Sequence, residues 1–214
     1  DQRINMFFGS QVKMKSVLAA ELAALSAWRV LSVGDRVGAV VFSDDKIVSI
    51  APARSRATVM HILSTVSAFS KRLTVGRKAN PKQLNHALKN LSRNLSHDAL
   101  VISIGDGAGW NNRTTDLVKK IAQHNDFFAM KVFDPAEEKL PDIDSLIVSD
   151  GFLQVEVKGK NTHLQHRFRK DFEESLGVVR GELKKFGVPV IDINTIEPVH
   201  QQLLRALGDN RGHS

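Results

Sequence analysis

The segment Arg36-Val-Gly-Ala-Val-Val-Phe42 decides the fold class, because it is a short apolar run that follows directly on a helix-like segment. Gly34 precedes this run and Asp44 follows it, and an apolar run bounded by turn residues is typical of a buried strand. Residues 12–33 are rich in Ala and Leu, contain no Pro or Gly and end at Gly34, which predicts a helix with a glycine stop. A helix that leads into a buried strand indicates an α/β architecture.

The alternation of helix and strand continues along the chain as far as residue 133. We expect strands at residues 46–50, 99–104 and 127–133, and helices at residues 55–70, 81–95 and 114–124. This order is typical of a mostly parallel sheet with helices on both faces.

The pattern changes in the last third of the chain. Residues 145–149 and 152–157 flank Asp150-Gly151, which predicts a β-hairpin. We then expect a long polar helix at residues 161–186, a strand at 188–193 and a short helix at 198–207. We treat residues 1–214 as a single domain.

The composition is that of a globular chain without cysteine chemistry. The chain has 214 residues, of which 42% are hydrophobic, enough for one substantial core. The absence of Cys excludes disulfides, thiolate catalysis and cysteine-based zinc sites. No Walker A or Gly-x-Ser-x-Gly sequence occurs, and Gly105-Asp-Gly-Ala-Gly109 lacks the spacing of a dinucleotide loop. We therefore expect no cofactor and no enzymatic activity.

The chain also lacks an obvious membrane segment. No apolar run approaches the ~18 residues that span a bilayer. Because the chain begins at Asp1 and not at Met, we expect it to be part of a longer protein. The expected location is cytoplasmic, with membrane attachment only through an upstream region.

Two acidic residues lie where open α/β sheets bind ligands. Asp106 follows the predicted strand that ends at Ile104, and Asp1 precedes the first helix. Because ligands bind at the carboxyl ends of parallel strands, the two carboxylates converge if the strand that carries Asp1 is central. The alternative for Asp106 is the simpler role of a turn or helix-cap residue.

Three segments carry a resemblance to a known family: Asp1-Gln-Arg-Ile-Asn-Met-Phe-Phe-Gly-Ser10, Lys15-Ser-Val-Leu-Ala-Ala-Glu21 and Gly34-Asp-Arg-Val-Gly-Ala-Val-Val-Phe42. They resemble the von Willebrand factor A-like part of the bacterial domain-of-unknown-function 58 family. Residues 198–207 also look like the family's C-terminal helix, so the resemblance covers nearly the whole chain. It implies a Rossmann-like von Willebrand A-type fold in which Asp1 lies at the tip of a central strand whose body is upstream. It further implies a MoxR-type AAA+ ATPase as a partner, and no established activity.

The resemblance also implies a metal-ion-dependent adhesion site, from which this chain departs. That site is built from Asp-x-Ser-x-Ser, a Thr on a second loop and an Asp on a third, whose oxygen ligands suit Mg²⁺. Asp1 and Asp106 match the acidic positions, whereas Arg3 and Asn5 stand at the two serine positions. Arg3 cannot ligate a cation, so we expect a degenerate, metal-free site. If a metal binds, its ligands are Asp1, Asn5 and Asp106.

The substitutions suggest what replaces the metal. The Thr position of the family pattern falls near Asn80 or Lys82. Arg3, with or without Lys82, is positioned by this pattern to neutralise Asp1 and Asp106.

Basic residues form a second candidate surface. The net charge is +7, and cations are dense on the loop that precedes the third predicted helix, namely Lys71, Arg72, Arg77 and Lys78. With Lys13 and Lys15 nearby, this loop is either a binding surface for acidic partners or a solvated loop. Aromatic residues do not alternate with the cations, which disfavours nucleic-acid binding through base stacking.

These features favour a non-enzymatic scaffold or adaptor that binds a protein, with a MoxR-type AAA+ ATPase as the candidate partner. Divalent-metal-dependent ligand binding and charge-driven nucleic-acid binding stay open as alternatives.

Overall fold

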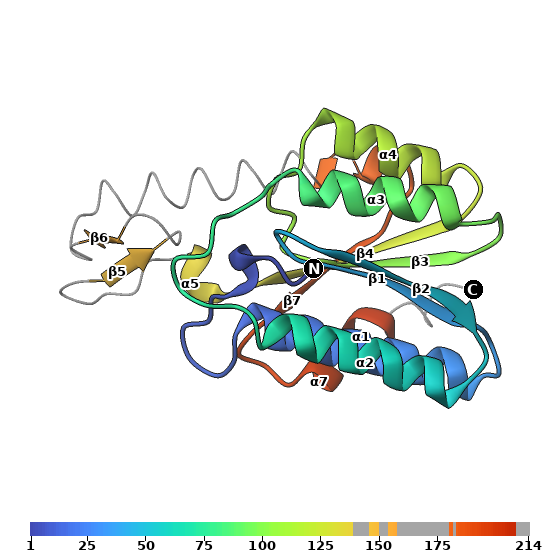
Figure 1. The fold of residues 1–214 in the computed structure, drawn as a ribbon, viewed down its shortest axis with the longest axis horizontal. Coiled ribbons are helices and arrows are strands. Elements are labelled where there is room, and N and C mark those ends of the chain that lie inside the picture. The colour runs from blue at the N-terminus through green and yellow to red at the C-terminus, as the bar shows by residue number, and fades with distance from the viewer. Residues whose placement is uncertain (139–145, 150–153, 158–179, 182, 209–214) are drawn as a thin grey trace.

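The computed structural model describes residues 1–138, 146–149, 154–157, 180–181 and 183–208. Figure 1 shows a layer of strands with helices on both sides of it. In chain order the elements are η1 (Ile4–Met6), α1 (Lys15–Ser32), β1 (Val37–Phe42), β2 (Ile47–Ala53), α2 (Arg56–Ser70), α3 (Gln83–Asn94), β3 (Leu100–Gly105), α4 (Asn112–Ala122), β4 (Asp126–Phe133), α5 (Pro135–Glu138), β5 (Leu146–Ser149), β6 (Gln154–Val157), β7 (Val190–Asn194) and α7 (Val199–Gly208).

Local sequence accounts for where two of the helices begin. The Ser55 hydroxyl accepts a hydrogen bond from the backbone N–H of Thr58 at 3.0 Å, which caps the start of α2. Asn111 and Thr114 form a reciprocal capping box at the start of α4. Both helices therefore begin where a polar side chain satisfies a free backbone N–H group.

A parallel sheet in the order β3-β4-β7 forms the centre of the fold. Its middle strand β4 is buried on both faces, because Phe127 packs toward one core cluster and Met130 and Val132 toward another. α3 and α4 cover the first face, while α1 and α7 cover the second (Figure 1). The α/β architecture with a parallel sheet is thus confirmed.

The prediction that the sheet is mostly parallel is wrong for the first two strands. β1 and β2 pair antiparallel as a separate sheet. Only residues 43–46 separate these two strands, which is too short for the crossover that parallel strands require. The α2 helix covers this hairpin with its own cluster of Ile62, Val66 and Phe69.

The predicted elements that fall on described residues are present, with shifted ends. The first helix begins at Lys15 instead of residue 12, because residues 8–14 form a tight turn closed by a bond from the Lys15 N–H to the Phe8 carbonyl at 2.7 Å. The hairpin strands β5 and β6 pair antiparallel as expected. The turn at 150–151 and most of the predicted helix at 161–186 lie outside the described residues.

Within the described part of the chain, none of the helices combines the length and the apolar character that a bilayer crossing requires.

Candidate functional site

The first residues of the chain join the two main sheets at one edge. The Asp1 backbone nitrogen donates to the Ile104 carbonyl at 3.0 Å, and the Gln2 N–H donates to the Phe42 carbonyl at 2.8 Å. Residues 1–2 therefore lie between the carboxyl ends of β1 and β3, as the N label in Figure 1 indicates. We call residues 1–6, with the loops 43–45 and 105–109, the strand-end rim.

Arg3 and Asp1 form a buried bidentate ion pair in the strand-end rim. The Arg3 Nη2 donates to Asp1 Oδ2 at 2.6 Å and its Nε donates to Asp1 Oδ1 at 3.0 Å. The Arg3 backbone N–H also donates to Asp1 Oδ1 at 3.0 Å. The two side chains are only 1% and 3% exposed, so neither charge is balanced by water. Each buried charge is therefore neutralised by the other side chain and not by solvent.

The Arg3 guanidinium also connects the chain start to the loop after β3. Its Nη2 donates to the Ala108 carbonyl at 2.9 Å, and its charge lies 5.5 Å from the centre of the Phe42 ring. Burial lowers the pKa of Arg3 from its usual value, while Asp106 and Asp44 raise it. An arginine keeps its proton under such conditions, so this position carries a permanent positive charge.

Asp106 is held by three donors on three different segments. Lys15 Nζ donates to Oδ2 at 2.9 Å, while Asn5 Nδ2 and the Ala108 N–H donate to Oδ1 at 2.8 and 2.9 Å. Burial alone raises the pKa of Asp106, but the Lys15 charge and these hydrogen bonds bring it down to about 2. Asp106 is consequently a permanent carboxylate at neutral pH.

Lys15 lies between two carboxylates although its side chain is only 3% exposed. Besides Asp106, its ammonium donates to Glu137 Oε1 at 2.5 Å. Burial lowers the pKa of Lys15, but the two carboxylates outweigh burial and raise it above its usual value. Lys15 is therefore the second fixed cation of the strand-end rim.

Glu137 is itself held by the backbone N–H of Asp134, a residue whose own carboxylate is buried. Its Oε2 accepts from the Asp134 backbone N–H at 2.9 Å. Asp134 is fully buried and accepts hydrogen bonds from the hydroxyls of Ser10 at 2.6 Å and Thr195 at 2.5 Å. These bonds connect the turn before α1 to the ends of β4 and β7, which positions Lys15 over Asp106.

Asp44 attaches the loop before α3 to the strand-end rim. Its carboxylate accepts from the Ile4 N–H at 2.7 Å and from the Asn80 N–H at 2.9 Å. The Asn80 side-chain NH₂ group also donates a hydrogen bond to the Asp44 backbone carbonyl at 3.0 Å. The loop after β1 and the loop before α3 are therefore fixed to each other at this edge.

The residues of the rim do not fit a divalent metal. Both oxygens of Asp1 accept from Arg3, and both oxygens of Asp106 accept from donors that include the Lys15 ammonium. Asn5 turns its NH₂ group, and not its carbonyl, toward Asp106. A cation placed here would face two fixed positive charges. Among the described residues, no three His, Cys, Asp or Glu side chains are grouped closely enough to hold a metal.

The structure separates the predicted rim residues into two groups. Asp1, Arg3, Asn5 and Asp106 lie together in one network. Lys82 is exposed at the start of α3, and its backbone N–H donates to Asn80 Oδ1 at 3.2 Å. The neutralising role that sequence reasoning gave to Lys82 is filled by Lys15, and the reason is the turn at residues 8–14, which directs the start of α1 toward Asp106.

Sequence reasoning missed Asp44 and Glu137, which complete this network. Asp44 comes two residues after the end of β1, so the rule that pointed to Asp106 applied to it as well. Glu137 follows β4 within the short helix α5, and no comparable pattern marked it in the sequence.

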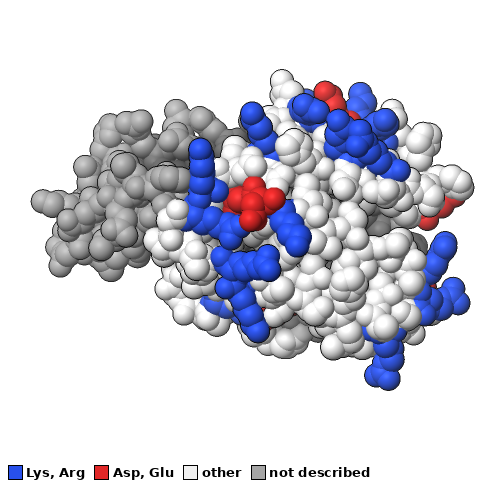
Figure 2. All heavy atoms as spheres, viewed as in Figure 1, with Lys and Arg blue, Asp and Glu red and all other residues white. Residues whose placement is uncertain are grey.

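The predicted basic patch lies on the loop between α2 and α3. Lys71, Arg72 and Lys78 are exposed, while Arg77 is partly buried and pairs with Asp45 at 2.5 Å. Arg77 also donates to the Arg72 carbonyl at 3.1 Å, which braces the loop. Figure 2 shows cationic side chains around a small acidic group on this face of the molecule.

Replacing Gly105 with alanine is expected to displace Asp1. An added Cβ would lie 2.9 Å from the Asp1 Cβ and 3.2 Å from its Oδ2. Crowding of this kind costs about 1–3 kcal/mol of unfolding free energy, which chemical denaturation measures. Gly181→Ala is the control, because nothing lies within 4 Å of that Cβ, and it should leave stability unchanged or slightly raised. Equal stability of the two variants would contradict this placement of Asp1.

The depressed pKa of Asp106 predicts a loss of stability in acid. The pKa falls from 3.8 to about 2 on folding, so its stabilisation is complete above pH 3.8 and disappears as the pH falls toward 2. Each pKa unit corresponds to about 1.4 kcal/mol, which makes this contribution about 2 kcal/mol. The difference in unfolding free energy between the wild type and Asp106→Asn should shrink by that amount as the pH is lowered from neutral toward 2. Parallel pH profiles would show that Asp106 is not held ionised.

Comparison with known proteins places this chain in a family. A sequence model of one protein family matches residues 1–180, and this family is described as protein of unknown function DUF58. The chain belongs to the DUF58 family. The match contains the whole first half of the fold and the rim, which confirms the family resemblance for these residues. It ends before residues 198–207, so the likeness of that helix to the DUF58 C-terminal helix stays a prediction.

Two solved structures are similar to this DUF58 chain in fold. One is the conserved hypothetical protein BatB from Bacteroides thetaiotaomicron, with a TM-score of 0.50 and 13% identity over 98% of this chain and 94% of that chain. The other, an aerotolerance-related membrane protein from Bacteroides fragilis with multiple mutations to serines, gives a TM-score of 0.53 and 12% identity over 98% and 96% of the two chains. No curated protein matches the chain.

Proposed function

We propose that this DUF58 chain is a von Willebrand factor A-like, non-enzymatic scaffold whose strand-end rim binds a protein partner. The main support for this proposal is a pair of buried cations. Arg3 and Lys15 hold Asp1 and Asp106 at the carboxyl ends of β1 and β3. In open α/β sheets this edge is where ligands bind. In this proposal, two side-chain cations take the electrostatic place of an adhesion-site metal.

The chemistry of the rim supports binding over catalysis. A general acid or base needs a pKa near the working pH and a free position to exchange its proton. Asp106 has a pKa of about 2 and both of its oxygens are occupied by donors. The Asp1 carboxylate is saturated by Arg3 in the same way.

The exposed border of the rim supplies the contact surface. Lys78 and Lys82 are exposed on the loop that Asp44 fixes to the rim through Asn80. This loop lies close to the turn after β3, because a Cβ on Gly109 would be 2.7 Å from the Pro81 carbonyl oxygen. Its positive charge favours an acidic surface on the partner. The family resemblance makes a MoxR-type AAA+ ATPase the first candidate, and a cytoplasmic location belongs to the same proposal.

A pull-down with a nucleotide-loaded MoxR-type AAA+ ATPase tests the proposal. The wild type should retain the ATPase, and Lys78→Glu with Lys82→Glu should lose it by charge reversal at the exposed border of the rim. The matched control is Lys89→Glu with Arg93→Glu, which reverses two exposed charges farther along α3. Absence of binding by the wild type, or equal loss in both double variants, would count against the rim as the binding surface.

A further inference from the structure

A second charged surface lies at the end of the molecule opposite the strand-end rim. The strand β1 runs from this end to the rim, where Phe42 bonds to Gln2. At the start of β1, Val37 pairs with Ala53 of β2, so their neighbours Arg36 and Arg54 lie side by side at the open end of the hairpin. α1 ends and α2 begins at the same place.

Four arginines gather at this end, and we call them the arginine pole: Arg29, Arg36, Arg54 and Arg56. All four are exposed. The segments that carry them, residues 28–36 and 53–60, contain one acidic residue, Asp35, so four positive charges and one negative charge leave +3. Figure 2 shows several basic side chains at this end of the molecule.

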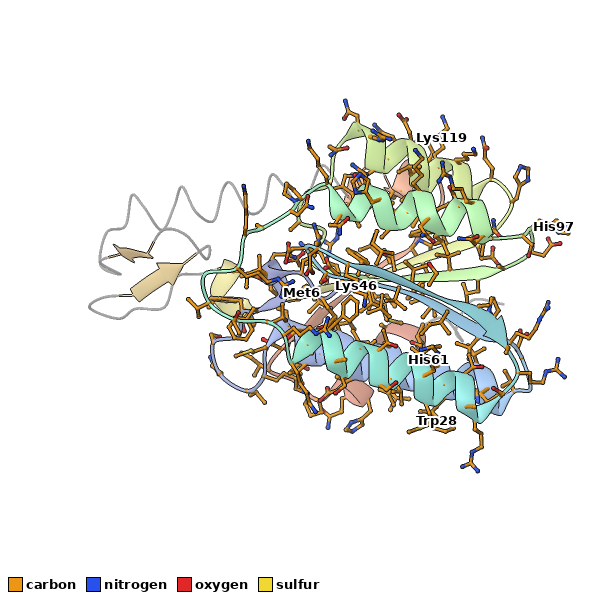
Figure 3. The ribbon with its side chains drawn as sticks, viewed as in Figure 1. Met6, Trp28, Lys46, His61, His97 and Lys119 are labelled. Atoms are coloured by element: carbon orange, nitrogen blue, oxygen red, sulfur yellow. The ribbon has the colours of Figure 1, made fainter. Side chains whose placement is uncertain are left out.

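Exposed apolar side chains lie among these arginines. Trp28 on α1 is 36% exposed, and Figure 3 shows it on the outer side of that helix. The Arg56 guanidinium lies 5.8 Å from the centre of the Trp28 ring. Val33, at the end of α1, and Met60, one turn after Arg56 on α2, are 62% and 56% exposed. Large apolar groups that project beside cations are costly to leave in water.

We infer that the arginine pole is a docking surface for an anionic phospholipid bilayer. Arginines bind lipid phosphates, and a tryptophan at the headgroup level places an apolar ring below a polar edge. The side chains of Val33 and Met60 can enter the acyl boundary while the four arginines stay among the headgroups.

The combination of positive charge and exposed apolar side chains favours a bilayer over an acidic protein or a nucleic acid. An acidic polypeptide would satisfy the arginines but would leave Val33 and Met60 against charged groups. A single-stranded nucleic acid would use aromatic rings for stacking, and Trp28 already carries the Arg56 guanidinium on its face. A duplex would bind the arginines through its phosphates but would offer no apolar layer to Val33 and Met60. A bilayer offers negative charge with an apolar layer beneath it, which matches both components of the surface.

Vesicle sedimentation measures this binding. The chain should bind vesicles of phosphatidylcholine and phosphatidylglycerol at low salt and should not bind pure phosphatidylcholine. Each arginine near an anionic surface contributes about a five-fold factor in partitioning, so Arg54→Gln with Arg56→Gln should lower binding about 25-fold. Arg113→Gln with Lys120→Gln on α4 removes two exposed charges elsewhere and should change binding much less.

Fluorescence quenching tests whether the apolar side chains enter the bilayer. Brominated lipid acyl chains should quench the wild type on anionic vesicles, and Trp28→Phe should abolish that quenching, with Trp110 as the internal reference. The inference is overturned by equal binding to neutral vesicles, by equal losses in the two double variants, or by unquenched Trp28. Binding to polyglutamate or DNA without vesicle binding would overturn it as well.

Discussion

Arg3→Met is expected to lower the free energy of unfolding by about 3–5 kcal/mol, because it leaves the Asp1 carboxylate buried without its cation. The Asp1 and Arg3 side chains are 3% and 1% exposed, and three hydrogen bonds join the guanidinium to the carboxylate. The variant also loses the bond to the Ala108 carbonyl. Chemical denaturation of the wild type and the variant at neutral pH measures this loss.

Arg205→Met supplies the matched control for Arg3. Arg205 pairs with Glu197 on the surface, where the two side chains are 63% and 41% exposed. Water and salt screen such a pair, so its loss should cost at most about 1 kcal/mol. Adding Asp1→Asn to Arg3→Met should recover part of the lost stability, since no unpaired charge then remains. A cost for Arg3→Met as small as that for Arg205→Met would contradict the buried pair.

The second large effect is expected for Lys15→Met, again about 3–5 kcal/mol of unfolding free energy. This change leaves two carboxylates, Asp106 and Glu137, without their shared cation. It should also raise the pKa of Asp106 from about 2, because the Lys15 charge is the largest influence that lowers it. A titration of the carboxyl carbon by NMR measures that pKa directly.

Lys13→Met is the control for Lys15, two residues earlier in the chain. Lys13 pairs with Glu21 at 2.6 Å, but the two side chains are 18% and 41% exposed. Its replacement should cost at most about 1 kcal/mol and leave the pKa of Asp106 in place. An Asp106 pKa that stays near 2 in Lys15→Met would show that the hydrogen bonds of Asn5 and Ala108 are sufficient.

Local patterns predicted the elements of the fold better than their pairing. The apolar run at residues 36–42 and the helix before it are both present, because burial on a sheet requires those residue patterns. The strand at residues 46–50 was expected next to the first one, but the expectation of a mostly parallel sheet did not state that the short connection at residues 43–46 requires antiparallel pairing. The von Willebrand A-type arrangement of the strands stays a prediction.

Contacts in the rim between residues close in sequence could be predicted. Contacts between segments distant in sequence could not. Arg3 and Asp1 are two residues apart, and the resemblance placed both at one site. Lys15 reaches Asp106 across 91 positions, and Glu137 reaches Lys15 across 122. Those contacts depend on the turn that starts α1 at Lys15 and on the bonds of Asp134, which no periodic pattern in the sequence reports.

Calorimetric titration of the wild type with Mg²⁺ and Mn²⁺ tests most directly whether Arg3 and Lys15 replace a metal ion. Both carboxylates already accept hydrogen bonds from these cations, so a divalent ion would have to displace a buried arginine or lysine. We expect no heat of binding at millimolar metal and no change in thermal stability on adding a chelator. Stoichiometric binding that Asp106→Asn abolishes would contradict this account.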